Sequence, residues 1–110
     1  MTYDEELADR LRALLGDRPA LTEKKMFGGL AFLIGGNMAI AASGQGGILV
    51  RVDPEESDKL VASTPAEPME MRGREMAGWL RVGTAEVADD AELAAWVERG
   101  SAYAATLPPK

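Results

Sequence analysis

The chain contains no cysteine and no histidine. Without cysteine it cannot form disulfides or use a thiol nucleophile, and without histidine it lacks the commonest general base. The two absences also remove the usual ligand sets for zinc, haem and iron–sulfur clusters. We therefore expect no cofactor and no metal, and the lack of cysteine fits a reducing compartment such as the cytosol.

Long hydrophobic runs are also missing. No apolar stretch approaches the roughly 20 residues that span a bilayer. The amino-terminal segment MTYDEELADR is acidic and lacks the basic start and apolar stretch of a signal peptide. We expect a soluble, cytoplasmic protein without a membrane partner.

Basic residues are outnumbered. The chain has 12 Lys and Arg against 18 Asp and Glu, for a formal net charge of -6. Non-specific affinity for nucleic acids comes mainly from basic side chains that displace phosphate counterions. The net charge therefore argues against nucleic-acid binding.

The length and composition predict one folded domain. The chain has 110 residues, of which 46% are hydrophobic, and this is enough for one core but too short for two ordinary domains. We expect a single domain over residues 1–110, with a frayed tail at residues 107–110.

The segment from Lys24 to Val52 is expected to form the centre of the fold. It is rich in apolar residues and is divided by Gly35-Gly36-Asn37 and by the glycines between residues 44 and 47. Short apolar runs separated by such turns indicate an antiparallel meander. The predicted strands cover residues 26–34, 38–43 and 48–52.

The pair Gly28-Gly29 within the first of these runs has two interpretations. It is either a bulge where another backbone packs closely or a loop that approaches a ligand phosphate. We favour close backbone packing, because no Lys-Ser/Thr, helix start or spaced third glycine follows to form a phosphate-binding loop.

Capping patterns predict three helices. Thr2 with Glu5 opens the first, Asp53 with Pro54 the second, and Asp89 with Glu92 the third. Apolar residues at helical spacing follow the first and third caps: Leu7, Leu11, Leu14 and Leu15, then Leu93, Trp96, Val97, Gly100 and Tyr103.

Two further strands are predicted between the second and third helices, at residues 69–72 and 76–82. The predicted class is therefore α+β, with an antiparallel sheet of about five strands and the order α-β-β-β-α-β-β-α.

Catalytic equipment is scarce. Ser43, Ser57, Ser63 and Ser101 lie in no Gly-x-Ser-x-Gly elbow and have no histidine to activate them. Asp89-Asp90 is explained by helix capping. The expectation is a protein that is not an enzyme.

Two candidate surfaces follow from the side chains that the predicted core does not require. Partly covered aromatic and arginine residues are typical of protein interfaces, and they suggest a candidate interface of Phe27, Leu33, Trp79 and Arg81. A candidate basic strip contains Lys24, Lys25, Arg51, Arg72 and Arg74, joined by Arg81 where strands pair.

Several short sequence motifs, by their order and spacing, resemble the N-terminal domain of the TfoX/Sxy family of competence regulators. The motifs are KKMFGG from Lys24 to Gly29, Asn37-Met38, LVRV from Leu49 to Val52, GWLRV from Gly78 to Val82, and DAELAAW from Asp90 to Trp96, and the resemblance extends from about Tyr3 to Leu107. The resemblance implies a compact α+β domain with an antiparallel sheet. It also implies a bacterial, non-enzymatic coactivator that works with a transcription factor of the cyclic-AMP receptor protein type.

The regulators of that family usually carry a second domain after this one, whereas the 110 residues here correspond to the first domain alone. We therefore expect a stand-alone, single-domain member. The first functional hypothesis is a protein interaction module, with homodimerisation as one form of it. The alternative hypothesis is a nucleic-acid-binding domain that uses the basic strip on its sheet, against which the net charge of -6 and the acidic helices stand.

Overall fold

The computed structural model describes residues 3–26, 28–44, 46–71 and 73–109. Its elements follow in chain order: α1 (Glu5–Leu15), β1 (Leu21–Met26), β2 (Gly29–Ile34), β3 (Asn37–Ala42), β4 (Ile48–Arg51), α2 (Ser57–Ser63), β5 (Glu67–Met71), β6 (Arg74–Val82), a short 3-10 helix η1 (Thr84–Val87) and α3 (Asp90–Thr106).

The strands form one six-stranded sheet in the order β1-β2-β3-β4-β6-β5, and every neighbouring pair is antiparallel. The α+β class with an antiparallel sheet is therefore confirmed. The expected single strand over residues 26–34 is wrong, because a turn divides this region into β1 and β2. Gly28 adopts a φ of +76° in that turn, a conformation that glycine tolerates best.

Gly28-Gly29 is thus a turn whose backbone packs closely on another segment. A Cβ on Gly29 would lie 2.3 Å from the carbonyl oxygen of Ala42 and 3.1 Å from the amide nitrogen of Gly44. The neighbouring backbone belongs to β3 and to the loop after it. The interpretation as close backbone packing therefore holds.

Helix caps agree with the sequence in part. Asp89 caps α3 by accepting a hydrogen bond from the amide of Ala91 at 3.2 Å. The cap of α1 is Asp4, whose carboxylate accepts from the amide of Leu7 at 3.2 Å, whereas Thr2 lies outside the described residues. Asp53 caps a turn, since its Oδ1 accepts from the amide of Glu55 at 2.9 Å, and α2 begins only at Ser57.

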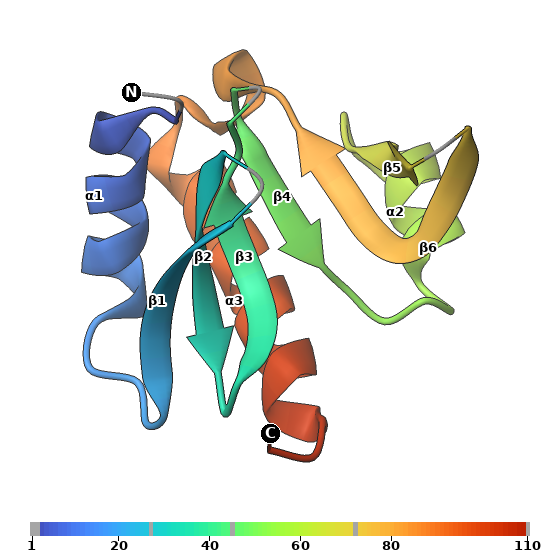
Figure 1. The fold of residues 1–110 in the computed structure, drawn as a ribbon. Helices are drawn as coiled ribbons and strands as arrows, with labels where there is room; N and C mark the ends of the chain where they lie inside the picture. The colour runs from blue at the N-terminus through green and yellow to red at the C-terminus, as the bar shows by residue number, and fades with distance from the viewer. Residues whose placement is uncertain (1–2, 27, 45, 72, 110) are drawn as a thin grey trace.

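The described helices pack on one face of the sheet (Figure 1). Leu7, Leu11 and Leu15 of α1 and Leu93, Trp96 and Val97 of α3 join the sheet residues Phe32, Ile40, Val50 and Leu80 in one buried cluster. Leu60 and Val61 of α2 pack against the same cluster. Helix α3 approaches the sheet closely at Gly100, where a Cβ would lie 2.4 Å from the carbonyl oxygen of Ala39.

Strand β6 bends at Gly78, which has a φ of +86°. The Gly78 amide donates to the hydroxyl of buried Ser57 at 2.6 Å, and its carbonyl accepts from the amide of Val52 at 2.8 Å. The bond from Val52 extends the pairing of β4 with β6 by one position, whereas the bond to Ser57 leaves the sheet, and before Gly78 strand β6 pairs only with β5. The hydroxyl of Ser57 is therefore occupied by a structural bond.

Ion pairs hold α1 to its surroundings. Arg10 bonds Asp90 at 2.7 Å and Arg12 bonds Glu23 of β1 at 2.8 Å, while Arg18 pairs with Glu98 of α3. The hydrogen bond from Arg12 lowers the pKa of the Glu23 carboxyl below its usual range. A depressed carboxyl pKa stabilises the fold at neutral pH, and this contribution is lost as the pH falls through the lowered pKa.

The chain end is held by a contact that the sequence did not suggest. The side-chain amide of Asn37, which is 3% exposed, donates to the carbonyl of Pro108 at 2.9 Å. Pro109 packs against Gly35, whose Cβ position would lie 3.6 Å from Pro109. These contacts join the turn between β2 and β3 to the segment after α3.

We expect Asn37→Ala to lower the free energy of unfolding by about 1 to 2 kcal/mol, because it removes a buried hydrogen bond and leaves the Pro108 carbonyl without its partner. Chemical denaturation gives the stability, and amide exchange at Leu107 reports the tail. Unchanged exchange at Leu107 together with an unchanged midpoint would show that the contact does not hold the tail.

Within the described ranges, α3 is the longest helix at 17 residues, and no helix there is both long and apolar enough to cross a membrane.

Candidate interaction surface

The sheet has one face that the described helices leave uncovered. Register across the strands brings one residue of each strand into a single row on this face: Lys24, Ala31, Ala41, Leu49, Arg81 and Glu67. The neighbouring positions Leu33, Arg51 and Trp79 point to the same side because side chains alternate along a strand. We call this side of the sheet the open face.

Large side chains on the open face are partly exposed. Leu33, Leu49 and Trp79 are half-buried, as are Arg51 and Arg81, whereas Lys24 is exposed. The alanines between them are buried, because their methyl groups lie lower than the taller side chains beside them. The open face therefore offers apolar and aromatic surface to another molecule.

The structure places three of the four candidate interface residues on this face. Leu33 lies on β2, and Trp79 and Arg81 lie two residues apart on β6. Phe27 lies outside the described residues. That these side chains form an interface remains a prediction.

The candidate basic strip is brought together only in part, because Arg51 and Arg81 lie on the same face of the paired strands β4 and β6. Lys24 lies on the open face, but Lys25 pairs with Leu30 and points to the helix-covered side. Strands β2 and β3 separate Lys24 from Arg51 by roughly 14 Å, given the usual strand spacing. Arg74 is exposed in the hairpin between β5 and β6, and Arg72 lies outside the described residues.

Arg51 instead joins Trp79. The two residues are directly paired between β4 and β6, and the guanidinium carbon of Arg51 lies 5.1 Å from the centre of the Trp79 ring. The same carbon lies 5.8 Å from the ring centre of Tyr103 on α3. We call these three residues the Arg51 cluster. It lies at the border between the open face and the helices.

Sequence reasoning missed this cluster, because it assigned Arg51 to the basic strip and Trp79 to the interface. The pairing of β4 with β6 joins residues that are separated by α2 and β5. The alternation of Leu49 and Arg51 on one side was visible in the sequence, but not the partner strand.

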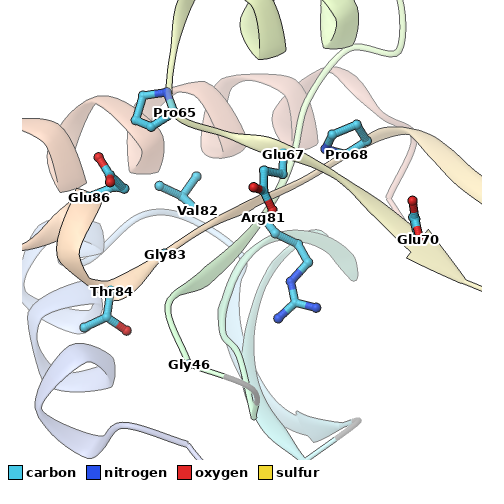
Figure 2. Close-up of a pocket in the computed structure, with 10 residues that line it drawn as sticks. All are labelled: Gly46, Pro65, Glu67, Pro68, Glu70, Arg81, Val82, Gly83, Thr84 and Glu86. Carbon is cyan, nitrogen blue, oxygen red and sulfur yellow. The ribbon is translucent and has the colours of Figure 1, made fainter.

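A groove lies next to Arg81 (Figure 2). It has a volume of about 1000 Å³ and is lined by β5, the end of β6, η1 and the loop before β4. Its lining includes three exposed acidic residues, Glu67, Glu70 and Glu86, and one arginine, Arg81. The groove is thus wide, polar and mainly acidic.

Two of the four serines considered as nucleophiles use their hydroxyls in structural bonds, whereas the buried hydroxyl of Ser101 has no hydrogen-bond partner within the described ranges. The Ser57 hydroxyl bonds Gly78, and the Ser63 hydroxyl donates to the carbonyl of Lys59 at 2.9 Å. In the part of the chain that the structure describes, no three Asp, Glu, His or Cys side chains are arranged to hold a metal ion.

Comparison with known protein families gives one match. The model of the family described as the TfoX N-terminal domain matches residues 13–104, from the last turn of α1 almost to the end of α3. No curated protein and no solved structure matches the chain.

Proposed function

Because the chain belongs to the TfoX N-terminal domain family, we propose that it is a non-enzymatic interaction module that binds a partner protein through the open face. One observation carries the proposal: a sheet face without helices that presents half-buried Leu33, Leu49 and Trp79. Aromatic residues and arginine are enriched in protein interfaces, and apolar surface of this kind is stabilised when a partner covers it.

Charge supports a protein partner over a nucleic acid. The net charge is -6, and the groove beside Arg81 contributes three carboxylates to the surface next to the open face. Of the basic residues in the candidate strip, Lys24, Arg51 and Arg81 lie on the open face, whereas Lys25 points to the helix-covered side. A nucleic-acid backbone would meet repulsion here that an uncharged or mixed protein surface would not.

The family resemblance suggests the kind of partner. We propose a transcription factor of the cyclic-AMP receptor protein type, for which the chain would act as a bacterial, cytoplasmic coactivator. A second copy of the chain is the other partner to test, since a two-fold dimer is the commonest form of self-association.

We expect Trp79→Ala to weaken the binding of a purified transcription factor of the cyclic-AMP receptor protein type (the receptor-type factor) at least tenfold. A central interface tryptophan typically contributes about 2 kcal/mol or more to binding. Isothermal titration calorimetry against wild type measures the change. Lys59→Ala on α2 is the matched control, since Lys59 is exposed on the helical side of the molecule and should leave the affinity unchanged.

Equal affinities of wild type and Trp79→Ala would reject the open face as the binding surface. A duplex DNA probe tests the alternative function in the same instrument. A DNA affinity that falls steeply with salt would favour nucleic-acid binding over the proposal. The sign would be a slope of several units when the logarithm of the affinity is plotted against the logarithm of the salt concentration.

A further inference from the structure

We propose that the Arg51 cluster is a carboxylate-binding site, at which an Asp or Glu side chain of the partner protein bonds the guanidinium of Arg51. The inference rests on the proposed function, because it names the chemistry that the partner presents at one edge of the open face. Three side chains carry it: Arg51, Trp79 and Tyr103.

Ring contacts hold the guanidinium and leave its donors available. Arg51 lies over the Trp79 ring at 5.1 Å and near the Tyr103 ring at 5.8 Å. The N–H groups of arginine point outward in the plane of the guanidinium, so a ring above that plane does not occupy them. The rings therefore reduce the freedom of the cation while its edge can still accept a carboxylate in the two-bond geometry.

Arg51 differs from three arginines on the helical side, whereas a fourth, Arg99 of α3, also lies over a ring, that of Trp96 at 4.5 Å, but is exposed. Arg10, Arg12 and Arg18 each pair with a carboxylate of this chain. Arg51 has ring contacts but no ion pair with any residue in the described ranges, although the chain has 18 acidic residues. A half-buried guanidinium without a carboxylate gains most when a partner supplies one.

The residue types support an interface role. Trp, Tyr and Arg are the three types most enriched among residues that dominate binding energy, and here they contact one another. All three are half-buried, so a partner can reach them while their own packing limits the entropy lost on binding.

A single carboxylate fits the surroundings better than a phosphate chain. Arg81 lies two residues from Trp79 along β6, or about 7 Å, and borders the groove that contains Glu67, Glu70 and Glu86. A nucleic-acid strand across the cluster would bring successive phosphates towards these carboxylates. One acidic side chain on a folded or extended partner avoids that repulsion.

The test uses the whole chain labelled with nitrogen-15 and a short peptide in which a single Glu is flanked by Val residues, acetylated and amidated at its ends. We expect saturable shifts of the Arg51 Nε–H and Trp79 indole N–H signals on titration. Arg51→Gln should weaken binding tenfold or more, since hydrogen bonds to charged groups are worth about 1.5 kcal/mol or more. Arg51→Lys should have an affinity between those of wild type and Arg51→Gln, because it keeps the charge and loses the paired donors.

Arg74→Gln is the control, because it removes the same charge from an exposed position beyond the bend at Gly78. The inference is overturned if Arg74→Gln weakens binding as much as Arg51→Gln, or if the matched peptide with Gln in place of Glu binds equally well. It is also overturned if a single-stranded oligonucleotide binds more tightly than the acidic peptide.

The two proposals fail separately. If Trp79→Ala loses affinity for the transcription factor and the wild-type chain does not bind the acidic peptide, the open face stands as the binding surface and the carboxylate site is rejected. Peptide binding at Arg51, combined with a factor that binds Trp79→Ala as well as wild type, would keep the site and reject the proposed partner surface.

Discussion

Replacing Trp96 with alanine is expected to lower the free energy of unfolding by about 4 kcal/mol. Trp96 is 1% exposed and is among the largest fully buried side chains of the core between α3 and the sheet. The substitution removes its apolar contacts and leaves a cavity that the surrounding strands cannot fill. Because small domains have about 5 to 15 kcal/mol of stability in total, this loss is a large fraction of the whole.

The other tryptophan of the chain is the matched control. Trp79 is half-buried on the open face, so Trp79→Ala should cost only about 1 kcal/mol, mostly from lost contact with Arg51. Urea denaturation followed by far-ultraviolet circular dichroism measures both variants without depending on tryptophan fluorescence. Equal losses would contradict the assignment of Trp96 to the core and Trp79 to the surface.

Gly100→Ala has two opposing effects, and we expect the unfavourable one to be larger. Alanine in place of glycine inside a helix stabilises by about 1 kcal/mol. A Cβ at this position, however, would lie 2.4 Å from the carbonyl oxygen of Ala39 and 3.2 Å from Cγ1 of Val50. The carbonyl belongs to β3 and cannot rotate away, so α3 must move from the sheet at a cost of about 3 kcal/mol. The expected net loss is about 2 kcal/mol.

Gly83→Ala tests the same exchange where there is space. Nothing lies within 4 Å of a Cβ at Gly83, and its φ is -66°, which any residue adopts. We expect this variant to be as stable as wild type or slightly more stable. A stabilising Gly100→Ala, measured in the same urea titration, would show that α3 does not pack as closely on β3 as described.

Local patterns predicted the helices and turns well. Leu7, Leu11 and Leu15 recur at helical spacing and are buried in α1, and Asp89 caps α3 as expected. The small residues of β3 allow α3 to approach closely at Gly100. Each of these features depends on a few neighbouring residues, so the sequence specifies them directly.

Features that depend on distant residues were not predictable in the same way. The turn at Gly28 lies within a continuous apolar run, so one strand was expected over residues 26–34, and β1, which ends at Met26, was missed. The placement of β6 between β4 and β5 sets Arg51 beside Trp79, and no local pattern specifies this pairing. Leu33, Trp79 and Arg81 of the candidate interface lie on the open face, and their role there stays a prediction, whereas the Arg51 cluster required the register of the sheet.

Amide hydrogen exchange of the chain, alone and saturated with a purified receptor-type factor, tests the central claim most directly. If the open face binds the factor, protection should increase in β4 and β6 around Leu49 and Trp79, while α1 and α3 keep their free-state exchange. Protection confined to the helices, or unchanged exchange in β4 and β6 after the factor is added, would contradict the proposal that this sheet face is the interaction surface.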